Sequence, residues 1–362
     1  MNNIFKLVPH KTFDSFLNAV SNISHSTKRI IWRGEGLDEW HLTPTLFRNN
    51  GKKALLDIFG NEKYVNGIAD LLNAEALLLF DFYKECKKIG LGIPYVEMFE
   101  GLLDSREAFV QYSSGYYLDN QSPYYDIFNK IEVDQHGNIL SIKRNNSIEE
   151  LATVAQHNGI PTRLIDWTYD MNAALYFAAN EAIKQINNGR IDGNITIWAF
   201  DTLYSDLYLS PSKSKMEFLR LVNTSHYNNR RQQSQSGVLM YTNLGYLRTI
   251  MADYENFIEK IYREDKSLNC LYFFLSQIEN GILICKKIYE KEHAREGNKD
   301  TLHSPLRKIT LPYSELPKVI NYLEAVHANG TRYFPDYEGV YEYIVSKPKI
   351  NFALESIQKR GG

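Results

Sequence analysis

The sequence feature that most constrains the fold is a short polar segment between two helical patterns near the middle of the chain. Ser147 and Glu150 have the spacing of a capping box, which predicts a helix over 148–158. Alanines recur along a second predicted helix at about 172–183. Because alanine side chains are short, we expect the backbone of this helix to lie close against a sheet. The residues between the helices, 157–168, are interpreted as a loop, and such loops often carry binding and catalytic groups.

Runs rich in β-branched and aromatic residues predict the strands of that sheet. The predicted strands cover residues 29–34, 194–200, 238–242 and 307–313. Pro312 has no backbone N–H to donate, so the last of these strands is expected at a sheet edge. Further elements are helices at about 13–23, 63–90, 252–264, 314–329 and up to 344, a small hairpin at 133–140, and a surface loop at 291–304. Strands interrupted by helices in this way indicate an α+β fold.

Composition argues against several classes of protein. The 362 residues are 44% hydrophobic and 23% charged, as in ordinary globular proteins, and a formal net charge of −2 disfavours a strongly basic nucleic-acid binder. The three cysteines have no metal-ligand spacing, so neither a disulfide scaffold nor a structural zinc site is expected. No apolar run is long enough to span a membrane, and the first residues lack a signal-type apolar core. We therefore expect a cytoplasmic protein.

Chemically useful side chains occur at two places outside the polar segment. Arg33 and Gly34 end the first predicted strand, where a guanidinium can bind a phosphate or carboxylate and glycine lets a ligand approach the backbone. The alternative is that Arg33 pairs with a structural glutamate such as Glu75. Arg231 and Gln235 precede another predicted strand, and the arginine there can bind phosphate, including that of a nucleic-acid backbone. The alternative for this stretch is a solvated loop.

The polar segment itself is the third place. His157 suits a general base or a hydrogen-bond partner for a ribose hydroxyl, but a histidine at the end of a helix is also a common C-cap. Arg163 and Asp166 can bind a ligand or simply pair with each other. Thr168 stands near the N-terminus of the alanine-rich helix, where free N–H groups attract anions.

Several sequence blocks together resemble the FRG-domain family. The most specific is QHNGIPTRLIDWT at 156–168, followed by the helix ALYFA at 174–178. The others are WRG at 32–34, LTPTLFR at 42–48, RQQSQSG at 231–237 and FPDYEG at 334–339. The resemblance covers about 12–345. We therefore expect one FRG domain over 1–346, with a helical insertion at about 60–145, followed by a peripheral tail at 347–362.

A weaker resemblance, to ADP-ribosyltransferases, implies a site. In those enzymes an aromatic-Arg-Gly strand binds the NAD diphosphate, a second strand supplies Ser or Thr before a packed helix, and a third strand supplies Glu or Gln. Arg33, Thr168 and Gln235 occur here in that order, although the chain has no clear Glu-x-Glu strand. The resemblance implies NAD as the cofactor and a mixed, largely antiparallel central sheet of ADP-ribosyltransferase-like type surrounded by helices.

The site expected from these patterns has two parts and no metal. The expected catalytic residues are Arg33, His157, Asp166 and Gln235. The expected NAD-binding residues are Arg33, Gly34, Arg48, Arg163, Thr168 and Arg231.

Three functions follow from these patterns. The first is an NAD-dependent ADP-ribosyltransferase or NAD glycohydrolase that acts as an effector, in a bacterial toxin or in phage defence. The second is a non-catalytic nucleotide or nucleic-acid sensor, in which four arginines line one groove. The third is a structural interaction domain, in which Asp166 is buried between arginines in a network that is costly to break. The sequence predicts no membrane association and identifies neither the target molecule nor the oligomeric state.

Overall fold

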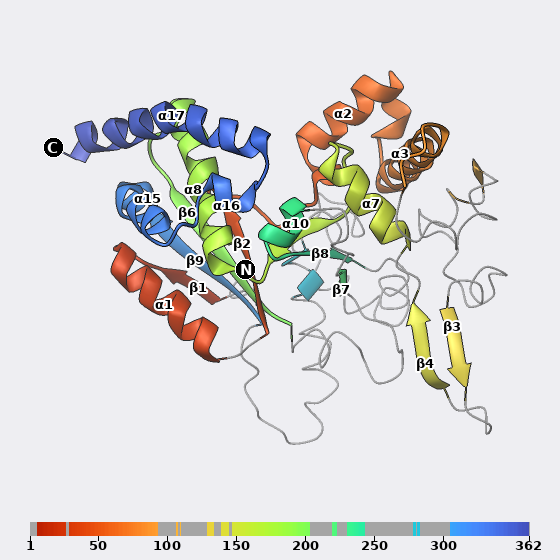
Figure 1. Cartoon of the computed structure of the whole chain (residues 1–362), viewed down its shortest axis with the longest axis horizontal. Coiled ribbons are helices and arrows are strands. Elements are labelled where there is room, and N and C mark those ends of the chain that lie inside the picture. Colours follow the sequence, from red (N-terminus) through yellow and green to blue (C-terminus); the bar gives the residue numbers. More distant parts are fainter. Residues whose placement is uncertain are drawn as a thin grey trace, which may run out of the picture.

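A mixed sheet of seven strands forms the centre of the computed structural model (Figure 1). In chain order its strands are β1 (Lys6–Pro9), β2 (Ile30–Glu35), β5 (Ile165–Thr168), β6 (Asn194–Asp201), β7 (Leu219–Val222), β8 (Gly237–Thr242) and β9 (Leu306–Pro312). They lie in the order β1-β9-β6-β2-β5-β8-β7, and neighbouring strands are antiparallel except β1 and β9. The structure describes residues 6–26, 29–92, 106–107, 109, 129–133, 139–144, 147–202, 219–222, 230–242, 278–279, 281–282 and 305–361.

Helices cover both faces of the sheet, which confirms the predicted α+β class (Figure 1). One face carries α1 (Phe13–Ser26), α8 (Met171–Asn187), η6 (Tyr313–Glu315), α15 (Leu316–Ala325), α16 (Gly330–Tyr333) and α17 (Tyr337–Gly361). The other carries η1 (Thr45–Phe47), α2 (Asn49–Phe59), η2 (Glu62–Tyr64) and α3 (Ile68–Lys88). Within β2, Ile31 faces the α3 side while Ile30 and Trp32 face the α8 side, as the two-residue period of a strand requires.

Three further elements lie beside this arrangement. The helix α7 (Ser147–His157) packs on the far part of α3, and α10 (Arg230–Ser234) leads into β8. The antiparallel pair β3 (Asn129–Val133) and β4 (Ile139–Arg144) stands apart from the large sheet (Figure 1). Its strands flank the hairpin predicted at 133–140. Among the helices of the described residues, none combines the length and apolar character that a membrane span requires.

The alanine-rich helix α8 packs directly on β2, as its small side chains predict. Ala173, Ala174 and Ala178 are fully buried at this contact. A Cβ atom built on Gly34 would lie 1.8 Å from the main-chain oxygen of Ala174, which is far inside van der Waals contact. Glycine is therefore required at position 34 because the helix backbone occupies the space that any side chain needs.

Replacing Gly34 with alanine is expected to destabilise the protein by about 1–3 kcal/mol, because α8 must move to admit a methyl group. Urea unfolding followed by circular dichroism measures the change. Gly92→Ala is the matched control, since open space surrounds its Cβ position. A Gly34→Ala protein as stable as the wild type would contradict the close packing of α8 on β2.

Two strand predictions are corrected by the structure. The segment 157–168 is not a loop throughout, because its end forms β5, where Ile165 and Trp167 are buried in the core. The strand that ends at Pro312 is not at the edge, because β1, which the sequence analysis missed, pairs with its outer side. Pro312 is tolerated there because the pairing with β1 stops at Thr310, so no β1 partner needs its N–H.

The helices also differ in extent from the predictions. The last helix does not end at 344 but continues as α17 to Gly361, even though it contains Pro348. Within the residues expected as a tail, Ala353 is fully buried in the α8 core, and Ile350, Leu354 and Ile357 pack against that core. The helices α2 and α10 were not predicted. The predicted helix at 252–264, the surface loop at 291–304 and part of the expected insertion at 60–145 lie outside the described residues.

Candidate functional site

A cleft of about 1560 Å³ lies at the place where β2 and β5 separate. These strands share one register pair, Trp32 with Thr168. On their other edges β2 pairs with β6 and β5 pairs with β8. Residues 165–167 of β5 have no register partner on β2. Arg33 Nη1 donates instead to the main-chain oxygen of Asp166 at 2.7 Å. An arginine side chain thus replaces a missing sheet bond in the wall of the cleft.

Two arginines share one carboxylate in this wall. Arg33 Nε donates to Glu35 Oε1 at 2.7 Å, and Arg48 Nη2 lies 3.9 Å from the same oxygen. Arg33 and Glu35 meet because residues two apart on a strand point to the same face. Arg48 approaches from the end of η1, where its Nε donates to the Thr43 main-chain oxygen at 2.6 Å. This Arg33–Glu35–Arg48 cluster carries one net positive charge before any ligand binds.

The pKa of Arg48 is lowered, first by burial and then by the neighbouring charge of Arg33. Glu35 and Asp166 partly oppose both effects. The side chains of Arg33, Glu35 and Arg48 are 14%, 5% and 34% exposed, so water screens the repulsion incompletely. An anion bound at the two guanidiniums would relieve it. The cluster therefore has the chemistry of a phosphate or carboxylate site.

Asp166 and His157 reach the cleft from the polar segment. The carboxylate of Asp166 is exposed and accepts a hydrogen bond from Gln156 Nε2 at 2.9 Å. The side-chain oxygen of Gln156 accepts in turn from the Thr162 hydroxyl. His157 is exposed at the end of α7, and its ring makes no hydrogen bond to the residues that the structure describes. The carboxylate is thus held in place, whereas the His157 ring is not.

Arg163 does not line the cleft. The two pairings considered from the sequence, Arg163 with Asp166 and Arg33 with Glu75, are not found. Arg163 Nε donates to Glu75 Oε2 at 2.5 Å and its main-chain N–H donates to Glu75 Oε1 at 2.7 Å. Because Arg163 binds Glu75, it does not pair with Asp166, and Arg33 pairs with Glu35 rather than with Glu75. Arg163 therefore lies in a structural ion pair and not in the ligand-binding position expected for it.

The hydroxyl of Thr168 is used by the fold. It donates to the main-chain oxygen of Gln235 at 2.6 Å and accepts from the N–H of Asp170 at 2.9 Å. Asp170 in turn caps α8, since its carboxylate accepts from the N–H of Asn172 at 2.9 Å. Thr168 thus positions the residues before β8 and the start of α8, and it lines the cleft while doing so.

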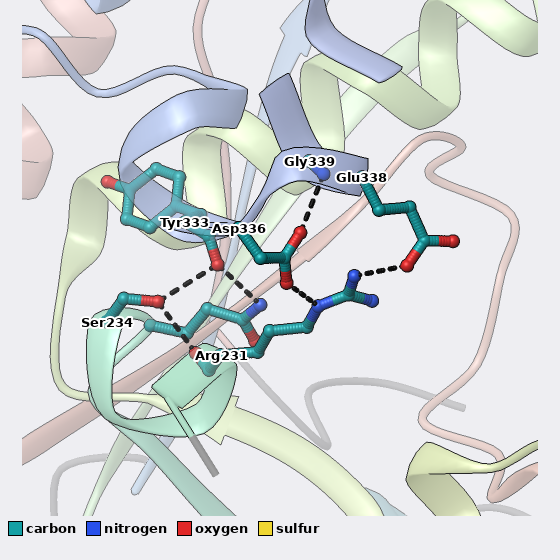
Figure 2. Close-up of polar contacts among 7 residues, drawn as sticks. Arg231, Ser234, Tyr333, Asp336, Glu338 and Gly339 are labelled. Atoms are coloured by element: carbon teal, nitrogen blue, oxygen red, sulfur yellow. Dashed lines mark hydrogen bonds and ion pairs between the residues drawn. The ribbon is translucent and has the colours of Figure 1, made fainter. Parts of the chain in front are cut away.

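Arg231 lines the cleft, but two carboxylates already neutralise its charge. Figure 2 shows its Nε donating to Asp336 Oδ2 at 2.7 Å and its Nη2 donating to Glu338 Oε2 at 2.6 Å. These bonds raise the pKa of Arg231 and lower the pKa of Asp336. Nearby, Gln235 Nε2 donates to the main-chain oxygen of Tyr333 at 3.2 Å. The arrangement anchors α10 to the start of α17, and a phosphate at Arg231 would have to displace a carboxylate.

The rest of the lining mixes charges of both signs with aromatic side chains. The basic members are Arg33, Arg48, Lys184, Arg231 and Lys349, and the acidic members are Glu35, Glu39, Asp166, Glu181, Glu338 and Glu342. Aromatic members include Trp40, Tyr176, Phe177, Phe334 and Tyr343. Five basic and six acidic residues give no overall positive surface. Within the described ranges, no group of three His, Cys, Asp or Glu side chains could hold a metal ion.

The structure therefore brings most of the expected residues together and adds others. Those that line one cleft are Arg33, Gly34, Arg48, His157, Asp166, Thr168, Arg231 and Gln235. Sequence reasoning missed the role of Glu35, although its two-residue spacing from Arg33 on a predicted strand was a usable signal. It also missed His41, which lines the cleft and binds Glu279. These two residues are 238 positions apart in the sequence, so no local pattern could indicate their pairing.

Comparison with known proteins gives one match. A model of the FRG domain matches residues 110–186. No curated protein and no solved structure matches the chain. The matched range contains His157, Asp166 and Thr168, whereas Arg33, Arg48 and Gln235 reach the same cleft from outside that range.

Proposed function

The chain carries an FRG domain, and from this premise we propose that its cleft binds a nucleotide containing a diphosphate, NAD in the first place, and removes nicotinamide from it. One observation carries the proposal: the Arg33–Glu35–Arg48 cluster places two partly buried guanidiniums beside one carboxylate. A diphosphate would pair its negative charges with these two guanidiniums. Its oxygens also match the paired N–H groups that guanidiniums present.

The dimensions and lining of the cleft fit such a ligand. Pockets for small molecules usually measure about 300–1,000 Å³. At about 1560 Å³ this cleft is larger than that, so it has room for a ligand as large as a dinucleotide. Aromatic side chains such as Tyr176, Phe177 and Phe334 line it beside the charged groups. A dinucleotide needs this combination, because its two rings pack on apolar surface while its diphosphate binds cations.

The strand order supports the comparison with ADP-ribosyltransferases. Arg33 is on β2, Thr168 is on β5, and Gln235 lies two residues before the start of β8. These three strands are neighbours in the sheet. Trp32 lies opposite Thr168, and Thr168 lies opposite Gly237. Residues that the resemblance places in sequence along the chain are thus also adjacent in space.

In the proposed reaction the bond between nicotinamide and ribose C1′ breaks, and its electron pair leaves with nicotinamide. Water, or a hydroxyl of a target molecule, adds to C1′ and releases a proton. Arg33 and Arg48 hold the diphosphate, His157 and Asp166 hold ribose hydroxyls, and Gln235 lies near the bond that breaks. Positioning and electrostatic stabilisation can supply most of the rate in such a step. The biological role we propose is that of an NAD-consuming effector, of the kind used in toxins or phage defence.

A nucleic-acid sensor is the less favoured alternative. A strand of nucleic acid needs a positive surface along its phosphates, but acidic residues outnumber basic ones in the lining of this cleft. A non-catalytic nucleotide sensor would use the same cluster. Turnover of NAD separates it from an enzyme.

Incubating the purified protein with NAD tests the proposal. We expect nicotinamide to accumulate in proportion to protein and time, as measured by chromatography. Arg48→Gln is expected to slow its release at low NAD by about tenfold or more, since a charge-assisted hydrogen bond is lost. Arg106→Gln is the control, because this arginine pairs with Asp81 outside the cleft lining. Binding without release would leave a nucleotide sensor, and neither binding nor release would reject the proposal.

A further inference from the structure

A histidine and a buried glutamate form a pair at the cleft that the site described above does not use. His41 lines the cleft with its side chain 56% exposed, and its Nδ1 lies 2.6 Å from Oε1 of Glu279, whose side chain is 2% exposed. One ring nitrogen therefore binds a buried carboxylate. The other, Nε2, is the ring nitrogen left for the cleft.

The buried carboxylate is held in a defined position. Its second oxygen, Oε2, accepts from the N–H of Leu42 at 3.1 Å, and the N–H of Ile278 donates back to the Leu42 main-chain oxygen at 3.1 Å. Lys308 is one charged group that interacts with it, since Glu279, together with Asp38 and Glu35, opposes the lowering of the Lys308 pKa by burial. A carboxylate buried without such partners would be costly. The bonds to Leu42 thus fix Glu279 and, through it, the His41 ring.

A carboxylate at Nδ1 selects one form of the ring. It accepts a hydrogen bond from Nδ1–H, so the neutral imidazole keeps its proton on Nδ1 and its lone pair on Nε2, where it can accept another proton. This is the chemical arrangement of a general base with an orienting carboxylate. His157 has no such orienting group among the described residues. The two cleft histidines therefore differ in how firmly the ring is held.

The loop that carries His41 also positions Arg48. The N–H of Thr43 donates to the His41 main-chain oxygen at 2.8 Å, and the Thr43 main-chain oxygen accepts from Arg48 Nε at 2.6 Å. A nucleotide whose diphosphate lies on Arg48 is thus bound by the same short loop that presents His41.

We propose that His41 is a catalytic residue of this cleft and that Glu279 is its positioning residue. This inference rests on the proposed function. His41 Nε2 accepts the proton of the water or target hydroxyl whose oxygen adds to ribose C1′, while the C1′–N electron pair leaves with nicotinamide. The products are nicotinamide, the ADP-ribosyl product and an imidazolium that returns its proton to solvent.

The test compares His41→Gln and Glu279→Gln with the wild type. We expect the kcat for nicotinamide release to fall by about 100-fold or more in both, as for loss of a general base. The dissociation constant for NAD should stay within about threefold, because neither residue belongs to the Arg33–Glu35–Arg48 cluster. If His41 is the general base, the rate of the wild-type protein rises with pH. The rate of the His41→Gln variant should show no such rise. The control variant is His327→Asn, because His327 is exposed and follows α15. Asparagine is chosen because it tolerates the positive φ of this position.

A second measurement does not depend on NAD. Nitrogen-15 chemical shifts of the His41 ring should place the proton of the neutral form on Nδ1 in the wild type, and Glu279→Gln should shift it toward Nε2, because an amide can donate to Nδ1. If the wild type neither binds nor cleaves NAD, the proposed function fails, and this shift still decides whether the pair is built as a base. A wild-type proton on Nε2, or loss of release in His157→Gln but not in His41→Gln, would overturn the inference.

Discussion

Replacing Glu75 with alanine is expected to lower the free energy of unfolding by about 3–5 kcal/mol, as for other broken buried ion pairs. Glu75 lies on α3 with its side chain 1% exposed, and its two oxygens bind the main-chain N–H and the Nε of Arg163. Alanine removes both bonds at once. The guanidinium of Arg163, which is only 16% exposed, then loses its carboxylate where water cannot fully replace it.

Urea unfolding of a set of variants checks this prediction. Glu85→Ala breaks the exposed pair of Glu85 with Lys88 and should change stability by less than about 1 kcal/mol. The double change Glu75→Leu with Arg163→Met should recover much of the loss, because neither buried charge remains. The same double variant should bind NAD like the wild type, since Arg163 does not line the cleft. A loss below about 1 kcal/mol in Glu75→Ala would contradict the structural role given to this pair.

Replacing Arg48 with glutamine is expected to weaken NAD binding by about 10- to 150-fold while leaving the fold nearly as stable as before. The loss of affinity corresponds to about 1.5–3 kcal/mol for a hydrogen bond to a charged group. Stability should change by less than about 1 kcal/mol, because two effects oppose each other. The variant loses the bond from Nε to the Thr43 main-chain oxygen, but it also removes the repulsion between Arg48 and Arg33.

The sign of the stability effect follows from the pKa. A basic group whose pKa is lowered by the fold destabilises the folded state while it is charged. The pKa of Arg48 is lowered in this way by burial and by Arg33. A guanidinium nevertheless stays charged across the usual working range of pH. The stability gained in Arg48→Gln by removing this charge should therefore be the same at every pH at which the protein is studied. Titration calorimetry and urea unfolding give the two numbers. Loss of stability together with unchanged NAD affinity would indicate that Arg48 is structural.

Parts of the fold were predictable from local pattern. Strands β2, β6 and β8 and helices α1, α3 and α8 all follow from runs or stripes of apolar residues. The packing of α8 on the sheet followed from its alanines, because small residues imply close approach. β1 could not be found, since its four residues, of which the last is Pro9, have no pattern of their own and pair with β9. The predicted helix ended at 344, whereas α17 continues through Pro348 to Gly361.

Three of the arginines expected in the site, Arg33, Arg48 and Arg231, line the cleft and Arg163 does not, and the carboxylate partners of these arginines were not predicted. Arg33 and Asp166 stood out as reactive side chains beside predicted elements, and both line the cleft. Which carboxylate each arginine binds depends on how strands and helices pack. Glu35 lies on the same strand face as Arg33, whereas Glu75 reaches Arg163 from 88 positions away. His41 and Glu279 come together only in the folded chain, so their pairing needed the structure.

The central claim is that the cleft recognises a diphosphate through Arg33 and Arg48, and calorimetric titration of the wild-type protein with NAD, ADP-ribose and adenosine tests it most directly. NAD and ADP-ribose should bind at one site with dissociation constants within about tenfold of each other. The dissociation constant for adenosine should be at least about 100-fold higher than that for ADP-ribose, since adenosine lacks the charge-assisted hydrogen bonds of the diphosphate. Adenosine binding as tightly as ADP-ribose, or the absence of any heat with NAD and ADP-ribose, would contradict the claim.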